Sequence, residues 1–367
     1  MKLLFDCHTF DAGPQGTSTF LAGLLNALPE AAAPEETTIV CAAHQPGSVA
    51  RFIYVPHQVR AMSGGFVARN LRAIPELTKE HGVQAVISQY VRPFRSHVPT
   101  VSVIHDVVFL DFPALFSWRY RMLRRLLFGW AARRSDVVIT VSEYSRERIA
   151  HHFGISTDRI DVLPNAVEVT GPAPDKPLPG PGAPIRLLYV SRFETRKRQH
   201  WCVAAANALA ASGRPVELTL VGDARGSYAD SVRAMIAADQ VPGATIRILS
   251  DVSQETLDTL FADADLFLFP SECEGFGIPV IEAAAHGVPG VVAANTALSE
   301  LIGRYAGIAF KGDTVDEFVE AVREAIADLP ALREQAAICM PATRAAYRWP
   351  EIARGFVAIL RKRGVLS

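Results

Sequence analysis

DLFLFPSECEGFGIPVIEAAAHGVP, residues 265–289, combines a buried strand, a polar loop and a helix in one short segment. Four of its first five residues are large and apolar, which is typical of a strand covered on both faces. The loop 270–277 contains two glycines, while Pro279 and Gly287 are typical of the first turn and the end of a helix. Strand, short loop and helix form the repeating unit of a parallel sheet. The segment therefore predicts an α/β fold.

The same alternation of apolar strands and helical patterns runs through the whole chain of 367 residues. In the first half, we predict strands at 2–6, 37–43, 51–55, 84–88, 100–106, 136–142 and 160–163. In the second half, we predict strands at 185–191, 217–223, 246–249, 265–269, 290–293 and 307–310. Between the two sets, TGPAPDKPLPGPGAP (170–184) is too rich in Pro and Gly for a helix or a strand to continue. The sequence thus predicts two Rossmann-like, doubly wound parallel-sheet domains facing across a cleft, 1–170 and 185–346, with a linker at 171–184.

Composition excludes several classes of protein. Hydrophobic residues make up 49% of the chain, which is enough for a sizeable core and rules out a disordered protein. A net charge of -1 gives no overall attraction to nucleic acid. The five cysteines have no metal-ligand spacing, so we expect neither a zinc site nor a disulfide framework. No apolar run approaches the roughly 18 residues that cross a bilayer, and we expect a cytoplasmic protein without a transmembrane helix.

Two carboxylates bracket the loop of the segment 265–289. Glu274 lies in the loop and Glu282 in the first turns of the helix. Ligands of doubly wound sheets bind beyond the carboxyl ends of the strands, and a helix N-terminus attracts phosphate. Gly275, Phe276 and Gly277 could offer backbone N–H groups to a diphosphate or to sugar oxygens. Taken alone, a Glu near a helix start is equally well explained as a partner of the helix dipole.

Cations follow the first strand of the second half. In YVSRFETRKRQH (189–200), Arg192 and Lys197 come between that strand and the next helix. Two fixed cations could stabilise the charge that develops on a departing diphosphate, and a metal ion would then be unnecessary. A solvated basic helix start is the alternative interpretation.

A histidine ends an apolar strand of the first half. His105 stands in TVSVIHDVVFLDFP (100–113), where a strand of a parallel sheet reaches its ligand-binding edge. An imidazole there could hydrogen-bond a sugar hydroxyl or take part in proton movement at neutral pH. The alternative is a histidine that is satisfied by packing at a strand end.

The stretch EGFGIPVIE (274–282), with seven residues between its two glutamates, resembles the signature of the retaining glycosyltransferases of family 4, which have the two-domain GT-B fold. The resemblance implies that Glu274 contacts the hydroxyls of the donor sugar and that Glu282 contacts the ribose of the nucleotide. It assigns Arg192 and Lys197 to the diphosphate and places His105 near the reacting centre. The resemblance covers nearly the whole chain and is weakest from 44 to 98.

Further segments resemble landmarks of the same family. Gly16 belongs to a glycine-containing first loop that lies under the diphosphate in the family, and LSDVS (249–253), which contains Val252, corresponds to a segment that holds the base. Residues 347–367 resemble the last helix of the family, which crosses back onto the first domain. One departure is visible, because the family usually has Gly after the Lys and this chain has Arg198.

The segment 113–134 is basic and contains no acidic residue. Its arginines alternate with apolar and aromatic side chains, and they are Arg119, Arg121, Arg124, Arg125, Arg133 and Arg134. Such a helix could lie on the anionic inner face of the cytoplasmic membrane. It could equally be a crossover helix with its apolar stripe on the sheet and its arginines in water. Nucleic-acid binding is less well supported, since no recognition motif accompanies the arginines.

The resemblance implies a metal-independent, retaining glycosyltransferase without a cofactor. The sequence is most similar to bacterial mannosyltransferases of O-antigen or exopolysaccharide synthesis. We therefore expect transfer of mannose from GDP-mannose to a saccharide or lipid-linked saccharide of the bacterial surface, such as lipopolysaccharide. A UDP-sugar-dependent glucosyl- or GlcNAc-transferase and a sugar-nucleotide epimerase of the same fold are the alternatives. A nicotinamide-dependent oxidoreductase would need GxGxxG after its first strand, which neither half contains.

Overall fold

The protein divides into two compact units, each built on its own parallel sheet. The computed structural model describes residues 1–13, 15–32, 37–169, 176–180, 182–239, 241–302 and 304–366. Unit 1 consists of Met1–Ala166 together with Tyr347–Ser367, and unit 2 consists of Val167–Ala346. The predicted α/β class, with a doubly wound parallel sheet in each half, is confirmed. The first unit ends four residues before the boundary predicted at 170, and part of the predicted linker, 171–175 and 181, lies outside the described residues.

Sheet A of unit 1 has seven parallel strands in the order β3-β2-β1-β4-β5-β6-β7. The strands are β1 (Lys2–Asp6), β2 (Thr38–Ala43), β3 (Gln58–Ala61), β4 (Ala85–Gln89), β5 (Thr100–Val103), β6 (Val137–Thr140) and β7 (Ile160–Val162). The order reverses between β1 and β4, which therefore flank the topological switch point where such sheets bind ligands. The central strands β1, β4 and β5 are buried almost throughout, as expected for strands covered on both faces.

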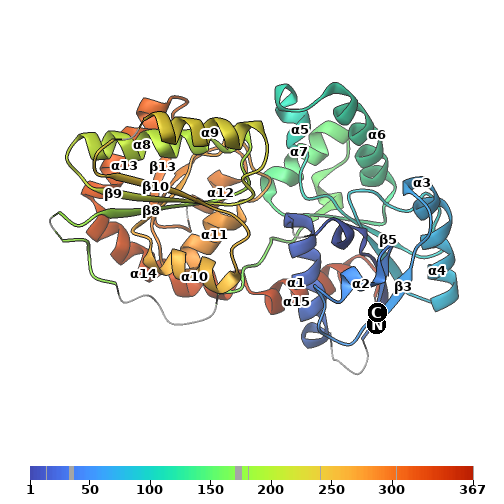
Figure 1. The fold of residues 1–367 in the computed structure, drawn as a ribbon. Coiled ribbons are helices and arrows are strands. Elements are labelled where there is room, and N and C mark those ends of the chain that lie inside the picture. Colours follow the sequence, from blue (N-terminus) through green and yellow to red (C-terminus); the bar gives the residue numbers. More distant parts are fainter. Residues whose placement is uncertain are drawn as a thin grey trace. The chain divides into compact units, whose positions relative to one another are not determined.

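Helices and short helical turns cover sheet A (Figure 1). They are η1 (His8–Ala12), α1 (Gly16–Ala31), α2 (Pro46–Val49), α3 (Phe66–Ala68), the π-helical turn η3 (Arg69–Ala73), α4 (Ile74–His81), α5 (Val108–Asp111), η4 (Pro113–Leu115), α6 (Trp118–Arg134), α7 (Glu143–Phe153), η5 (Thr157–Arg159) and α15 (Trp349–Lys362). The last of these comes from the far end of the chain and packs against α1. A Cβ atom on Gly23 would lie 2.0 Å from the ring of Trp349, so the absence of a side chain at Gly23 allows the close approach of the two helices.

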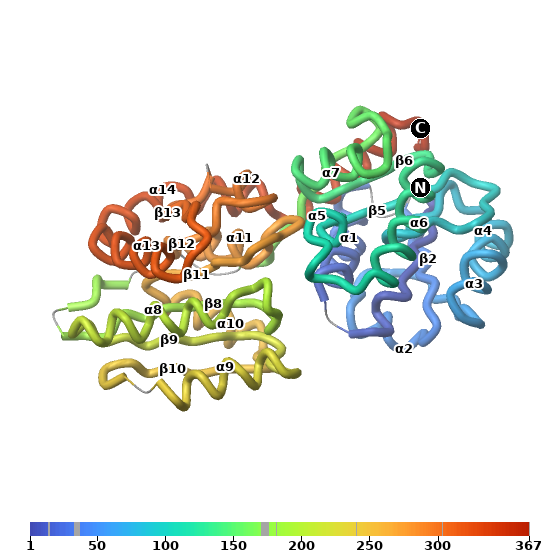
Figure 2. The backbone as a smooth tube through the Cα atoms, turned by 90° about the horizontal axis from the view of Figure 1, so that it is seen from above, coloured from blue at the N-terminus to red at the C-terminus, as the bar shows by residue number. Residues whose placement is uncertain are grey.

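Sheet B of unit 2 has six parallel strands in the order β10-β9-β8-β11-β12-β13, which Figure 2 shows side by side. The strands are β8 (Ile185–Val190), β9 (Val216–Val221), β10 (Ala244–Leu249), β11 (Leu266–Phe269), β12 (Gly290–Ala293) and β13 (Gly307–Phe310). The helices are η6 (Thr195–Lys197), α8 (Gln199–Ala211), α9 (Ser227–Ala238), α10 (Gln254–Asp263), α11 (Ile278–Ala285), α12 (Leu298–Ile302), α13 (Val315–Ala327) and α14 (Leu329–Ala346). Helices α8 and α9 lie along one face of the sheet, and α10 and α14 lie along the other (Figure 1). The switch point of this sheet lies between β8 and β11.

One predicted strand is wrong. Residues 51–55 form a turn, and the strand at this edge of sheet A is β3, a few residues later. Phe52 stacks on Phe10 at a centroid distance of 4.5 Å, and the side chain of Asn26 donates to the carbonyl of Phe52 and accepts from the amide of Tyr54. The apolar residues that suggested a strand therefore serve packing against the first helices, while the true edge strand is half exposed and weakly patterned.

Candidate functional site

An ion pair joins the two strands at the switch point of sheet B. Lys197 ends the turn after β8, and Glu274 lies in the loop after β11. The ammonium of Lys197 contacts carboxylate oxygen Oε1 of Glu274, and the two side chains are only 9% and 12% exposed. The backbone N–H of Glu274 donates to Oγ1 of Thr296 at 3.0 Å. This hydrogen bond ties the loop after β11 to the connection that follows β12. The structure thus brings together two of the predicted site residues, which are 77 positions apart in the chain.

The charges of this pair depend on each other. Burial acts to raise the pKa of Glu274, but the nearby cations Lys197 and Arg196 outweigh it and hold the pKa below its ordinary value. Burial lowers the pKa of Lys197, and the carboxylate of Glu274 opposes that effect. Two opposite charges in contact inside a protein favour each other's ionised form. Glu274 is therefore a carboxylate held ready to accept hydrogen bonds, beside a cation that can meet a phosphate.

Arg196 is a site residue that the sequence analysis missed. Its guanidinium lies 3.8 Å from Oε2 of Glu274 and 2.7 Å from Oε2 of Glu194, and it donates to the carbonyl of Cys273 at 2.8 Å. Arg196 thereby ties the turn after β8 to the loop after β11. The signal was present in the basic triplet 196–198, but sequence alone does not show which member of a basic run turns inward.

Arg192 lies differently from Lys197. Its side chain is 61% exposed and pairs with Oε1 of Glu194 at 3.2 Å, while its carbonyl accepts a hydrogen bond from Gln199. The structure does not bring Arg192 into contact with Glu274. Its predicted role at the diphosphate stays a prediction, whereas Arg196 and Lys197 form the basic side of the described site.

The departure at Arg198 has a structural consequence. Arg198 adopts the left-handed conformation, with a φ of 55°, directly before α8. Glycine adopts this conformation without the steric cost that a side chain brings. The guanidinium carbon of Arg198 lies 4.3 Å from the centre of the Trp201 ring, and a terminal nitrogen lies 3.8 Å from the carboxylate of Glu272. These contacts offset part of the backbone cost.

The loop residues Gly275, Phe276 and Gly277 lead directly into α11, which begins at Ile278. Gly277 has a φ of 112°, and a Cβ atom there would lie 2.6 Å from the side chain of Leu298, so this turn requires glycine. The helix thus starts where the loop ends, and the partial positive charge of its N-terminus would favour an anion placed beside it. The predicted contacts of Gly275, Phe276 and Gly277 with a diphosphate or with sugar oxygens stay predictions.

Glu282 lies in the second turn of α11 and is half buried. Burial, reinforced by the carboxylate of Asp258, raises the pKa of Glu282 to about 7. Near neutral pH, Glu282 is therefore protonated in part of the molecules, where it can donate a hydrogen bond, and ionised in the others, where it only accepts. Val252 is half buried in the connection between β10 and α10, at the same carboxyl edge of sheet B.

The corresponding edge of sheet A carries three histidines, His8 after β1, His44 after β2 and His105 after β5. His105 follows β5 and is buried, with ring nitrogen Nε2 3.0 Å from Oε1 of Gln89. Burial lowers the pKa of His105 to about 4, so its ring is neutral at physiological pH. His8 follows β1, and its Nδ1 lies 2.9 Å from Oδ1 of the buried Asp6. His8 was absent from the predicted site because nothing in the local sequence distinguishes it from a loop residue.

Gly16 is the first residue of α1. A Cβ atom there would meet no other atom within 4 Å in the described structure, so open space lies in front of this glycine. Gln15 and Ser18 form a capping box that fixes the start of the helix. This geometry is compatible with the close ligand approach predicted for Gly16, which stays a prediction.

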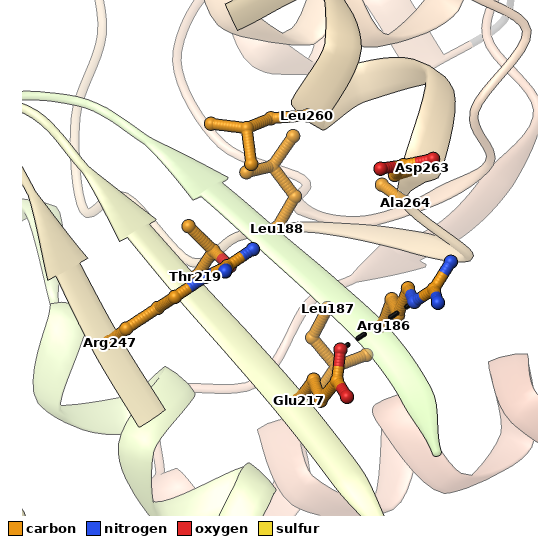
Figure 3. A pocket seen from close by; sticks show the side chains of 9 residues that line it. All are labelled: Arg186, Leu187, Leu188, Glu217, Thr219, Arg247, Leu260, Asp263 and Ala264. Carbon is orange, nitrogen blue, oxygen red and sulfur yellow. Dashed lines mark hydrogen bonds and ion pairs between the residues drawn. The ribbon is translucent and has the colours of Figure 1, made fainter. Parts of the chain in front are cut away.

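A cavity of about 240 Å³ lies on one face of sheet B, and none of the predicted site residues lines it (Figure 3). It is lined by residues of β8, β9 and β10 and by the end of α10. Arg186 pairs with Glu217 at 3.5 Å, and Nε of Arg247 donates to Thr219 at 2.8 Å across the strands. Because ligands of doubly wound sheets bind beyond the carboxyl ends of the strands, we do not assign the donor to this cavity.

Helix α6 exposes apolar side chains as well as arginines. Trp118, Met122 and Leu126, spaced four residues apart, share one side of the helix and are each more than half exposed. The described residues include no helix that is both long and apolar enough to cross a membrane. Phe128 and Ala132, on another side of α6, pack into the core with Val138 of β6, as the interpretation of 113–134 as a crossover helix expects, whereas this side of α6 is exposed.

Comparison with known proteins identifies the family. A model described as "Glycosyl transferases group 1" matches residues 175–338, and one described as "Glycosyltransferase Family 4" matches residues 14–170. A glycogen synthase of Mycobacterium tuberculosis is 29% identical over 272 residues, which are 73% of this chain and 64% of that protein. The O-antigen chain mannosyltransferase B of Escherichia coli is 28% identical over 239 residues, which are 62% of this chain and 61% of that protein. These matches span less than two thirds of the relatives' own length.

Solved structures show the same fold. The sucrose-phosphate synthase of Thermosynechococcus elongatus superposes with a TM-score of 0.79 at 16% identity, covering 100% of this chain and 99% of that chain. The Anabaena protein HepE, solved with UDP and glucose, superposes with a TM-score of 0.73 at 18% identity, covering 98% and 99%. Likeness at this level of identity supports the fold alone. Together with the two family models, it confirms that the chain belongs to the GT-B glycosyltransferases of family 4.

Proposed function

We propose that the protein transfers a hexose from a nucleotide sugar to an acceptor hydroxyl with retention of configuration, without a cofactor and without a metal ion. The observation that carries the proposal is the contact of Lys197 with Glu274, flanked by Arg196, at the switch point of sheet B. A carboxylate that accepts sugar hydroxyls and two cations that meet a diphosphate are the groups that such a transfer needs.

The chemistry follows from where charge develops. As the bond between the anomeric carbon and the phosphate oxygen breaks, negative charge grows on the diphosphate. Lys197 and Arg196 are already fixed by Glu274 and the carbonyl of Cys273, so little reorganisation is required to stabilise that charge. Their charges supply what a divalent ion supplies in other enzymes. Transfer that is undiminished by a chelator would support this part of the proposal, and loss of transfer would contradict it.

The first donor to test is GDP-mannose. Relatives at 28–29% identity include an O-antigen chain mannosyltransferase and a GDP-mannose-dependent phosphatidylinositol monomannoside mannosyltransferase, whereas HepE was solved with UDP-glucose. A thermal-shift screen of GDP, UDP, ADP and CMP identifies the base, because a ligand that binds only the native state raises its melting temperature. A shift with GDP alone supports GDP-mannose, and a shift with UDP alone supports a UDP-sugar transferase. Donor incubated without acceptor separates both from an epimerase, which would still form product.

We further propose that the acceptor is a saccharide, free or lipid-linked, of the bacterial surface, and that α6 lies on an anionic bilayer. The apolar stripe Trp118, Met122 and Leu126 would enter the interface, and the arginines beside it would meet lipid phosphates. A cavity of about 400 Å³ next to the stripe is lined by Leu126, Trp130 and Phe153 and by the basic side chains Arg125, Arg133, Arg134 and His152. Apolar walls beside cations suit a phospholipid headgroup and the start of its chains.

Vesicle flotation tests the membrane proposal. Wild-type protein should float with vesicles of phosphatidylcholine and phosphatidylglycerol, and float poorly with phosphatidylcholine alone. The double variant Met122→Glu/Leu126→Glu should lose flotation with the anionic vesicles. Ile338→Glu, which places the same charge on an exposed apolar position of α14 in unit 2, is the matched control and should behave as wild type. If the double variant floats as well as wild type, the proposal is contradicted. If wild type is a dimer and the double variant is a monomer, this side of α6 binds a protein partner instead.

A further inference from the structure

Lys197 is held in place by groups from two neighbouring strands of sheet B. Its backbone carbonyl accepts a hydrogen bond from the hydroxyl of the buried Tyr189, on β8, at 2.9 Å. Its ammonium lies 5.6 Å from the centre of the ring of Phe269, on β11, and contacts Oε1 of Glu274. The positive charge of Lys197 is therefore fixed, and an anion that uses this charge has to bind beside Glu274.

Glu274 is fixed as well, and it is ionised. Its backbone N–H is bound to Thr296, and the nearby cations Lys197 and Arg196 keep the pKa of its carboxyl below the ordinary value. The guanidinium of Arg196 is 3.8 Å from Oε2 of Glu274 and 2.7 Å from the carboxylate of Glu194. Lys197 and Arg196 are thus each matched by a carboxylate before any ligand binds.

This arrangement acts against a bare diphosphate. An ammonium has three N–H donors, so Lys197 can bind Glu274 and a phosphate oxygen at the same time. The two anions then lie on the same cation and repel each other, and at side chains that are only 9% and 12% exposed this repulsion is weakly screened. Glu274 therefore positions Lys197 but weakens the binding of a diphosphate to it.

The sugar of a nucleotide sugar changes this balance. In the proposed function, hydroxyls of the donor sugar donate hydrogen bonds to the carboxylate of Glu274. Hydrogen bonds to an ionised acceptor are strong, and they offset the repulsion from the diphosphate. After transfer the hydroxyls are gone, and the diphosphate faces the carboxylate alone.

We propose that Glu274 promotes product release, because its carboxylate, held on Lys197, repels the nucleoside diphosphate that remains after the sugar has been transferred. The enzyme then binds the nucleotide sugar in preference to its own product. This inference rests on the proposed function and deepens it, since it assigns Glu274 a task in the step after transfer. All residues that take part belong to unit 2.

The test compares product and donor affinities in the full-length protein by calorimetry. The ligands are GDP and GDP-mannose, or UDP and UDP-glucose if the thermal-shift screen identifies UDP. Both Glu274→Gln and Glu274→Ala should bind the nucleoside diphosphate at least about 10-fold more tightly than wild type, because the repelling charge is gone. Neither variant should gain affinity for the nucleotide sugar, because each loses the carboxylate that accepts sugar hydroxyls. Measurement at about pH 6.5 keeps Lys197 protonated beside the diphosphate, although burial lowers its pKa.

Glu272→Gln is the matched control. Glu272 is in the same loop and carries the same charge, but its carboxylate lies 3.8 Å from Arg198 and is 35% exposed. Its replacement should change the affinity for the nucleoside diphosphate by less than about 3-fold. Equal tightening in Glu272→Gln would overturn the inference, because the effect would then come from the net charge of the loop.

The remaining outcomes separate a repelling charge from other causes. Tightening in Glu274→Gln but not in Glu274→Ala would overturn the inference, because the new amide would then donate a hydrogen bond to the phosphate. Unchanged or weaker binding of the nucleoside diphosphate in both variants would also overturn it. A wild-type protein that binds nucleotide but forms no glycoside with any donor would instead overturn the proposed function.

Discussion

Removing Glu274 should destabilise unit 2 as well as abolish transfer. In Glu274→Ala, the nearly buried ammonium of Lys197 loses its partner and is left beside Arg196, which has the same charge. Breaking a buried ion pair from one side costs about 3–5 kcal/mol. In a unit of about 180 residues, each kcal/mol lowers the melting temperature by about 2–4 °C, so the melting temperature should fall by about 6–20 °C. Lys197→Met should cost less, because Arg196 still lies 3.8 Å from the remaining carboxylate.

Differential scanning calorimetry measures these differences. Glu320→Ala is the matched control, because Glu320 forms an exposed pair with Arg323 at 3.2 Å in the same unit, and such pairs contribute about 1 kcal/mol or less. A Glu274→Ala protein that melts within about 2 °C of wild type would refute the reasoning, since it would mean that Lys197 reaches solvent without cost. Glu274→Gln keeps an oxygen acceptor for Lys197 and is therefore the variant in which loss of transfer can be attributed to the missing charge.

Three further predictions concern other residues. Because the pKa of Glu282 is raised to about 7, the contribution of Glu282 to the stability of the folded state should be lost as pH rises from the ordinary pKa of 4.5 through 7. Over the same range, the calorimetric affinity for the nucleotide identified by the thermal-shift screen should rise in wild type but not in Glu282→Gln. Arg198→Gly and Arg198→Ala both lose the contact with Trp201, but only the alanine variant keeps a side chain in the left-handed backbone conformation. The free energy of unfolding in urea should therefore be about 1 kcal/mol higher for the glycine variant. Gly23→Ala should destabilise unit 1 by about 1–3 kcal/mol, measured by its urea midpoint, because the new methyl group overlaps Trp349. An unchanged midpoint would show that α15 can shift without cost.

The sequence predicted most of the two sheets because central parallel strands are continuous apolar runs. The strands expected at 2–6, 290–293 and 307–310 coincide with β1, β12 and β13. The misplaced strand at 51–55 lies at the edge of sheet A, where apolar residues pack against helices and the edge strand itself is half exposed. The hydrophobic signal of β3 is weak, and local pattern therefore missed this edge strand, whereas it placed the edge strand β13 correctly.

The candidate site was predictable where residues follow strands in recognisable motifs. Glu274 and Lys197 belong to such motifs, and the structure brings them into contact. Arg196 could not be predicted, because its place beside Glu274 depends on a contact between two loops that only the fold provides. Sequence pattern identifies strand ends, whereas the direction of a side chain beyond a strand end is a property of tertiary packing.

The return of α15 to unit 1 has a consequence for synthesis of the protein. Unit 2 is one continuous segment and can complete its contacts as soon as it has emerged from the ribosome, whereas unit 1 lacks a helix until the residues after unit 2 have been added. At about 5–20 residues per second, the intervening 180 or so residues delay that helix by about 9–36 s. During this interval the groove at Gly23 and Phe20, which Trp349 later fills, is uncovered on the nascent chain. Chaperone contact with the emerging polypeptide should therefore concentrate on α1.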